Sequence, residues 1–235
     1  MKFCDNLQMR YIGGKGRTFQ QLINLMPPHD IYIETHLGVG SVIRNKKFCK
    51  RNIGIEIDPK VIGLWSEAER QGIEIIQTDA VDFLKSFKFT SKDMIYCDPP
   101  YLRETRRRKK KFYKFEYTVK QHIELLEIIK ALPCMVMISG YESDLYKEML
   151  KDWHVHTFQA KICVGVATEW LWMNYPPPSC LHDYSFLGDN FRQRERFKKI
   201  KENMVSRLEA MPVLERQALL AALEPMKAKE YLERV

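Results

Sequence analysis

The sequence predicts an α/β protein built on a mostly parallel sheet, and three observations indicate this fold class. Short apolar segments rich in β-branched residues alternate with stretches of helical periodicity, which is typical of parallel strands joined by crossover helices. Two β-like stretches then follow each other directly, which predicts an antiparallel hairpin that closes the sheet. A charged, helix-prone segment ends the chain of 235 residues.

Seven strands and six helices are expected before the C-terminal segment. The strands are Ile31–Glu34, Ile53–Ile57, Ile73–Ile76, Met94–Cys97, Met135–Ser139, Val155–Val164 and Glu169–Tyr175, the last two joined by a turn that contains Gly165. The helices are Thr18–Leu25, Ser41–Lys47, Pro59–Gln71, Val81–Ser86, Lys120–Leu132 and Ser143–Lys151. A proline suits the first turn of the third helix, because the N–H that it lacks would have no helical partner there.

Three consecutive prolines, Pro176 to Pro178, mark a change of pattern. We therefore expect one domain over residues 1–175 with a basic loop at 102–117, and a helical, basic tail over 176–235 that Pro212 and Pro225 interrupt. A membrane span would require a run of about 18 apolar residues, and the sequence contains no such run. The six cysteines show no metal-ligand spacing and follow no secretory signal, so a soluble cytoplasmic protein with reduced thiols and no metal site is expected.

Basic residues are concentrated in two stretches. The chain has 38 Lys and Arg residues against 30 Asp and Glu residues; residues 103–116 hold eight cations against two acids, and residues 192–207 hold seven against two. Clustered cations neutralise phosphates and release counterions, although a solvated charged surface is the alternative. Six adjacent cations repel one another strongly without a partner, which favours nucleic-acid contact by the first stretch. The residues expected to make this contact are Arg103, Arg106, Arg107, Arg108, Lys109, Lys110 and Lys111.

A glycine-containing turn follows the first strand. The carboxyl end of a parallel strand is where open α/β sheets bind nucleotides, and Gly38 and Gly40 let the backbone approach an adenosyl group closely. The dinucleotide fingerprint needs a further glycine at the position of Ile43, so a cofactor without a pyrophosphate is favoured over NAD. A purely structural turn is the alternative. The residues expected to line the cofactor pocket here are Glu34, His36, Leu37, Gly38, Gly40 and Ser41.

Acidic residues follow the ends of the next two strands. Glu56 and Asp58 close the second strand, where a carboxylate can accept the protons of both ribose hydroxyls. Glu56 is preferred for this role, because Asp58 can instead cap the following helix. Asp79 follows the third strand and can accept the adenine amino group of a cofactor, cap the next helix, or do both. Ile57 and Ala80 are expected beside these acids.

The fourth strand runs directly into Asp98-Pro99-Pro100-Tyr101, the most specific signal in the chain. An exocyclic amino group is a poor nucleophile, because its lone pair is delocalised into the ring. The Asp98 carboxylate and the Pro99 carbonyl can accept its two hydrogens, which frees the lone pair for attack on a sulfonium methyl group. Tyr101 can stack on a base that has been rotated out of a duplex. A proline-rich turn without chemical function is the alternative.

The order of these motifs resembles that of the Dam-like (D12 class) DNA adenine methyltransferases, over about residues 10–175. Within the first motif, Tyr11, Gly14 and Lys15 match a cofactor motif whose lysine approaches the methionine carboxylate, and residues 34–42 match the glycine motif. Glu56 matches the ribose acid, Asp79 the adenine-contacting acid and residues 98–101 the catalytic tetrad, while residues 169–175 match a late strand beside the target-base pocket.

The resemblance implies a Rossmann-like methyltransferase fold that uses S-adenosyl-L-methionine to methylate N6 of adenine in DNA, double-stranded by expectation, by base flipping and direct attack. Many Dam-like enzymes carry a recognition domain between the third-strand acid and the tetrad, yet only residues 80–97 intervene here. Target reading must then come from the basic loop, the tail or a protein partner, or be weak. We expect the loop over residues 103–117 to order on DNA and to support the flipped base.

Other functions remain open on the residues alone. An RNA adenine or a DNA N4-cytosine methyltransferase would use the same loop, since the loop serves any exocyclic amine. A release-factor glutamine methyltransferase is expected to have Asn at position 98, where Asp98 stands. A nucleic-acid-binding protein without catalysis would not need Lys15, Glu56, Asp79 and Asp98. His36 has no acidic or cysteine partner nearby in sequence, so it is interpreted as lining the pocket rather than as catalytic.

Overall fold

The computed structural model describes residues 15–16, 18–106, 113–162 and 165–232. The strands are β1 (Ile31–Glu34), β2 (Arg51–Glu56), β3 (Glu74–Gln77), β4 (Asp93–Cys97), β5 (Met135–Gly140), β6 (His154–Ile162) and β7 (Gly165–Met173). The helices are α2 (Phe19–Ile23), α3 (Pro59–Ile62), α4 (Glu67–Arg70), α5 (Ala80–Ser86), the short 3₁₀ turn η1 (Arg103–Thr105), α6 (Val119–Ala131), α7 (Asp144–Met149), α8 (Phe191–Glu209) and α9 (Val213–Leu232).

The described strands form one sheet in the order β3-β2-β1-β4-β5-β7-β6. The first five are parallel, and β7 runs antiparallel to both β5 and β6, so the predicted mostly parallel sheet with a closing hairpin is confirmed. Ile33 of β1 lies opposite Ile53 of β2 and Ile95 of β4. The chain order reverses between β1 and β4, and open α/β sheets bind ligands at the carboxyl ends of strands beside such a reversal.

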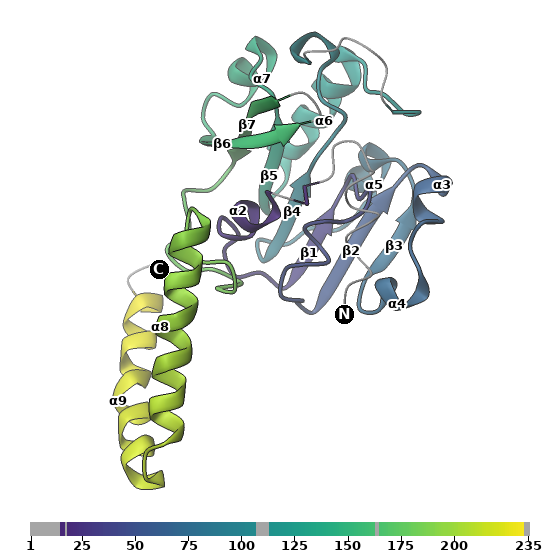
Figure 1. Ribbon diagram of the computed structural model, residues 1–235. Coiled ribbons are helices and arrows are strands. Elements are labelled where there is room, and N and C mark those ends of the chain that lie inside the picture. The colour runs from purple at the N-terminus through teal and green to yellow at the C-terminus, as the bar shows by residue number, and fades with distance from the viewer. Residues whose placement is uncertain (1–14, 17, 107–112, 163–164, 233–235) are drawn as a thin grey trace. The chain divides into compact units, whose positions relative to one another are not determined.

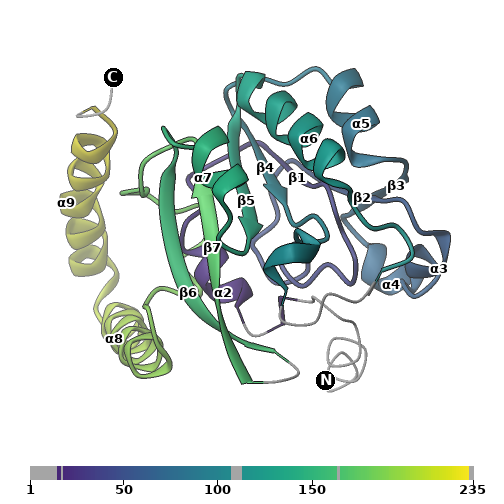
Figure 2. The same cartoon turned by 90° about the horizontal axis from the view of Figure 1, so that it is seen from above.

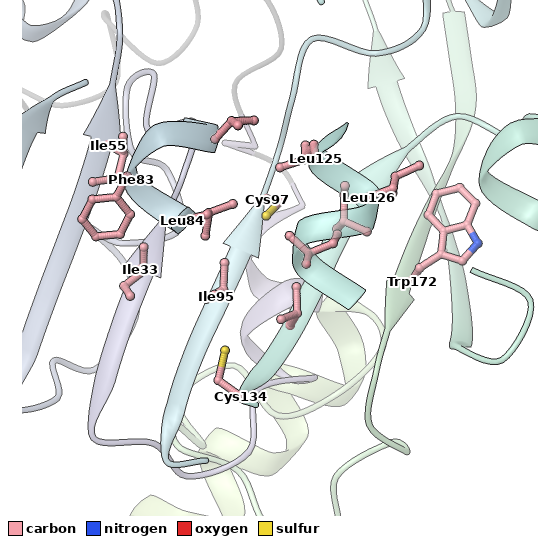
Figure 3. Close-up of a cluster of buried hydrophobic side chains, with 14 of the residues drawn as sticks. Ile33, Ile55, Phe83, Leu84, Ile95, Cys97, Leu125, Leu126, Cys134 and Trp172 are labelled. Carbon is pink, nitrogen blue, oxygen red and sulfur yellow. The ribbon is translucent and has the colours of Figure 1, made fainter. Parts of the chain in front are cut away.

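Apolar layers cover both faces of the sheet. Successive side chains of a strand point to opposite faces, so each face has its own apolar cluster. On one face, Ile33, Ile95 and Cys97 pack with Leu84 of α5 and Leu125 of α6 in a fully buried cluster (Figure 3). Helices α5 and α6 lie side by side on this face (Figures 1 and 2).

The opposite face buries a second cluster. Tyr32, Met94 and Tyr96 pack there against Leu22 and Ile23 of α2. Both faces of the central strands are therefore dry, which is typical of a parallel sheet in an α/β protein and holds the carboxyl ends of the strands in fixed positions.

Three helix predictions were wrong in detail. Residues 41–46 form successive turns instead of a helix, and only the Arg44 and Lys46 amides donate in helical fashion, to Gly40 and Val42. The expected helix over residues 59–71 is divided into α3 and α4, because Ser66 begins the second one with a capping box. Helix α9 continues through Pro225.

The C-terminal unit begins later than the prolines indicated. Residues up to Phe186 form one compact unit, and Leu187–Val235 form another. Asp183 accepts a hydrogen bond of 2.8 Å from the Lys47 amide, and the Phe186 carbonyl accepts one of 2.7 Å from Asn24. These contacts fix residues 176–186 to the sheet domain. Helix α8 begins after Asn190, whose side chain caps it, and no helix in the described part of the chain is long and apolar enough to cross a membrane.

Candidate active site

A pocket opens at the carboxyl ends of β1, β2, β3 and β4. Every described residue expected to bind the cofactor lines it, namely Lys15, Glu34, His36, Leu37, Gly38, Gly40, Ser41, Glu56, Ile57, Asp58, Asp79, Ala80 and Asp98. Tyr11 and Gly14 lie outside the described residues. Residues 113–117 line the same pocket, so the segment after the catalytic motif borders the site that the glycine turn forms.

The glycine turn is built for close approach. Gly38 and Gly40 have φ angles of 51° and 62°, in the left-handed region that favours glycine. A Cβ atom on Gly40 would lie 2.3 Å from the ring of Trp65, whose indole N–H donates to the Gly38 carbonyl at 2.9 Å. Trp65 therefore supports the turn from beneath, a role that no motif in the sequence indicated.

Glu34 is buried under the turn. One oxygen of its carboxylate accepts from the Ile43 amide at 3.0 Å and from the Tyr32 hydroxyl at 3.2 Å. Burial raises the pKa of Glu34 to about 8, although these hydrogen bonds act in the opposite direction. Glu34 is therefore largely protonated at neutral pH.

Replacing Glu34 with glutamine is expected to weaken the pH dependence of folding stability. Since the folded-state pKa lies near 8 and the usual value is 4.5, the unfolded chain releases this proton first as the pH rises. Glu34 therefore lowers stability progressively from about pH 4.5 to about pH 8, and adds no further loss above that. Thermal unfolding of both proteins between pH 5 and pH 8 measures the effect, and equal losses of stability in the two would contradict it.

Glu56 is held rigidly at the end of β2. Its two carboxylate oxygens accept hydrogen bonds of 2.9 Å, one from the Gly38 amide and one from the Asp58 amide. Burial raises the pKa of Glu56, and these amides partly counter that shift. Asp58 caps α3 through a 3.0 Å bond from the Lys60 amide, so the alternative role considered for Asp58 is present in the structure.

Asp79 also caps a helix while lining the pocket. Its Oδ1 accepts from the Val81 amide at 2.8 Å at the start of α5. A carboxylate has a second oxygen with its own lone pairs, so capping does not prevent an interaction with an amino group. The two roles considered for Asp79 are geometrically compatible.

Asp79→Asn and Asp79→Ala are expected to separate these roles. Asparagine caps helices as well as aspartate does, whereas alanine costs about 1 kcal/mol of stability. The asparagine cap uses the one amide oxygen and leaves an NH₂ group toward the pocket, which repels another amino group. Calorimetric titration with the cofactor should therefore show weaker binding by both variants, and thermal unfolding should show a loss only for Asp79→Ala. Unchanged affinity in Asp79→Asn would contradict an adenine contact.

The catalytic loop follows the fully buried strand β4. The Lys15 ammonium donates to both oxygens of Asp98 at 2.7 Å and to the Tyr101 hydroxyl at 2.9 Å. Burial alone would lower the pKa of Lys15, but Asp98 and Glu169 hold it above its ordinary value. The Tyr101 ring meets Tyr141 edge to face at 4.7 Å. Lys15 therefore contacts the carboxylate of the predicted catalytic motif directly.

His36 is buried and hydrogen-bonded on both ring nitrogens in this arrangement. Its ring nitrogens pair with the Thr35 hydroxyl at 2.9 Å and with the Tyr117 hydroxyl at 3.1 Å. Burial lowers the pKa of His36 to about 3, so the ring is neutral at physiological pH. It connects β1 to the segment after the catalytic loop.

The structure corrects the role expected for Arg106. We expected a phosphate contact, but the guanidinium is buried in an ion pair with Glu116 at 2.7 Å and also donates to the Tyr101 carbonyl. The side chains of Arg106 and Glu116 are each 7% exposed. Arg103 lies exposed on η1, and the expected contacts Arg107, Arg108, Lys109, Lys110 and Lys111 lie outside the described residues.

The model of the D12 class N6 adenine-specific DNA methyltransferase family matches residues 56–163. Over this region the chain is similar to D12 class methyltransferases. The D12 region contains Glu56, Asp79 and the catalytic loop, and it ends inside the closing hairpin. The resemblance drawn from the motifs is therefore confirmed over residues 56–163, and the protein is a methyltransferase that uses S-adenosylmethionine.

Several solved structures are similar to this chain at low sequence identity. Precorrin-6y C5,15-methyltransferase from Geobacter metallireducens GS-15 is 11% identical over 67% of this chain and 85% of its own, with a TM-score of 0.45. An rRNA methylase from Streptococcus thermophilus is 11% identical over 66% and 93%, with a TM-score of 0.43. TrmK from M. capricolum, solved with S-adenosyl-homocysteine, is 11% identical over 92% and 96%, with a TM-score of 0.44. A search of curated proteins gave no match.

The pocket fits the cofactor of this class. A Cβ atom on Gly40 would lie 2.3 Å from the Trp65 ring, so glycine lets the turn pack closely onto Trp65 while Gly38 and Gly40 line the pocket. Glu56 and Asp79 stand at the ends of neighbouring strands with acceptor oxygens toward the pocket, where a nucleoside offers hydroxyl and amino donors. These are the residues that would hold the adenosyl part of S-adenosylmethionine.

Proposed function

We propose that this chain transfers a methyl group from S-adenosylmethionine to the N6 amino group of adenine in DNA. The observation that carries the proposal is the shared pocket of the glycine turn and the catalytic loop, which Gly38, Gly40, Asp98 and Pro100 line together. A methyl donor held by the turn would therefore face the acceptor groups that hold the amine. The D12 match supports adenine in DNA as the substrate.

The catalytic loop performs three tasks in this mechanism. The Asp98 carboxylate and the Pro99 carbonyl accept the two N–H groups, so that the nitrogen lone pair leaves conjugation with the ring and becomes nucleophilic. The proton that the nitrogen loses passes to an Asp98 oxygen. Tyr101 stacks on the base, which offsets part of the cost of a few kcal/mol for unstacking it. S-adenosylmethionine supplies a methyl group on a positively charged sulfur.

The rigid parts of the site reduce the cost of positioning. Strand β4 is buried along its whole length, and its two flanking strands fix the point where Asp98 leaves the sheet. Groups held in place before the reaction need no reorganisation in the transition state. The arrangement therefore favours the transition state through geometry and charge and requires no side chain to act as a nucleophile.

The basic run Arg107–Lys111 is expected to bind the DNA backbone. Replacing these five cations with glutamine should weaken DNA binding and reduce the slope of log K against log salt by about 0.9 for each phosphate that is no longer neutralised. Fluorescence anisotropy with one duplex at several salt concentrations measures the slope. A control that replaces Lys198, Lys199 and Lys201 of α8 tests the tail separately, and an unchanged slope in the first variant would exclude the run as a DNA-binding element.

Mass spectrometry of nucleosides tests the proposed reaction. Unmethylated DNA and RNA are incubated separately with the protein and isotope-labelled S-adenosylmethionine, beside an Asp98→Ala control. Labelled N6-methyladenine in DNA that is absent from the control is the expected result. N4-methylcytosine, or label in RNA alone, would move the proposal to that substrate, and no transfer to either polymer would overturn it.

A further inference from the structure

Glu169 is a buried carboxylate beside the catalytic loop that the mechanism above does not use. It lies on β7 opposite Phe158 of β6, and the residue is 7% exposed. Its Oε2 lies 3.7 Å from the Lys15 ammonium and makes no hydrogen bond with any residue that the structure describes. A buried acceptor oxygen without a hydrogen bond is costly and rare, so its ion pair with Lys15 at 3.7 Å points to a closer contact in another state of the site.

Asp98 is a weaker acceptor for a substrate amine while it is paired as in this structure. Both Asp98 oxygens accept from Lys15 at 2.7 Å, and the third N–H of that ammonium points to the Tyr101 hydroxyl. An amine that enters competes with the ammonium for the oxygens and the negative charge of this carboxylate. Leaving a buried ammonium without an anion is unfavourable, so Lys15 needs another carboxylate when Asp98 turns to the substrate.

We propose that Lys15 moves from Asp98 to Glu169 when Asp98 accepts the target amino group. The inference rests on the proposed function in one respect: the group that enters the site is an exocyclic amine. Glu169 is the acceptor already within reach, and the backbone hydrogen bonds of β7 with β5 and β6 hold it in place. Glu169 is thus a positioning residue that acts through Lys15, and it does not touch the reacting atoms.

The charges of the cluster support this exchange. Lys15, Asp98 and Glu169 are each less than one-fifth exposed, and two carboxylates share one ammonium. Burial raises the pKa of Glu169, while Lys15 and Tyr101 act to lower it. An ammonium between two carboxylates can change partners without leaving the buried site, so Asp98 is released at a lower cost than by moving Lys15 into water.

A thermodynamic cycle tests the exchange without any measurement of activity. Asp98→Ala alone leaves Lys15 with Glu169, and Glu169→Gln alone leaves it with Asp98, so each single change is expected to lower the melting temperature by only a few degrees. The double variant leaves the ammonium without a carboxylate, and its loss should exceed the sum of the single losses by several degrees. Additive losses would overturn the proposal, whether or not the methylation reaction is the proposed one.

Kinetics with the active protein supply the second test. On whichever substrate the wild type methylates, Glu169→Gln is expected to lower kcat at least tenfold while the dissociation constant of S-adenosylmethionine stays within threefold. Glu169→Asp keeps the charge and should restore a large part of kcat. Wild-type kcat in Glu169→Gln, or equal losses in both variants together with weaker cofactor binding, would show a structural role only and contradict the exchange.

Discussion

Asp98→Ala is expected to lower kcat by a factor on the order of 10² to 10³, the effect of removing one well-placed electrostatic group from an active site. Without the carboxylate the amine keeps its lone pair in the ring, and the proton it must lose has no acceptor. Asp98→Asn keeps one acceptor oxygen but loses the charge and turns an NH₂ group toward the amine, so its kcat should fall between those of the wild type and the alanine variant. Single-turnover transfer at saturating cofactor and DNA measures the step directly.

Folding must be controlled in this experiment, because Asp98 also pairs with Lys15 at 2.7 Å. Calorimetric titration with S-adenosylmethionine shows whether the pocket remains intact, and we expect its affinity to change far less than kcat. Leu64→Ala is a suitable matched control, since this side chain is 45% exposed and takes no part in the pocket. Wild-type turnover by Asp98→Ala would exclude the assigned chemistry.

The strands and the acids of the candidate cofactor site could be predicted because both follow from a parallel sheet that is buried on its two faces. Apolar segments such as Met94–Cys97 become central strands when both sheet faces are covered, and the sequence shows this directly as an unbroken apolar run. The carboxyl ends of parallel strands meet at one edge of the sheet. Glu34 and Glu56 end such strands, Asp79 and Asp98 follow others, and the structure brings all four to one pocket.

The long-range contacts that support the site could not be predicted in the same way. Trp65 supports the glycine turn from the loop between α3 and α4, a contact that depends on tertiary packing and leaves no periodic signal. Glu169 was placed only in a late strand, because alternation predicts that a side chain faces one side of a sheet but not which charge lies there. Each of these contacts joins residues more than 20 positions apart.

Arg106 shows why a charge run was misleading. Six consecutive cations suggested one common role, yet the first of them is buried with Glu116. The sequence did contain a signal, since Glu116 is the first acid after the run and burial of an arginine requires an anion. Composition counts charges together, whereas the fold pairs this one cation with a particular acid.

Arg106→Met is expected to destabilise the loop strongly and to slow methyl transfer. Methionine fills part of the same volume but removes the guanidinium from the buried Glu116 carboxylate, and breaking a buried pair in this way costs about 3–5 kcal/mol. The substitution also removes the hydrogen bond from the guanidinium to the Tyr101 carbonyl. A displacement of about 1 Å in a catalytic group can cost 10²-fold in rate, so kcat should fall by up to this factor. Denaturant unfolding and single-turnover transfer measure the two effects.

A double variant separates stability from positioning. In Arg106→Met with Glu116→Leu no charge of this pair remains buried, and apolar replacements of an ion pair are often neutral or stabilising. Stability should therefore return close to that of the wild type, but kcat should stay low, because the guanidinium that donates to the Tyr101 carbonyl is gone. Recovery of kcat together with stability would show that the pair only stabilises the loop.

The salt dependence of DNA binding should be the same in both variants as in the wild type, since the buried guanidinium faces Glu116 and the Tyr101 carbonyl. A reduced slope of log K against log salt would show instead that Arg106 is one of the phosphate-binding cations.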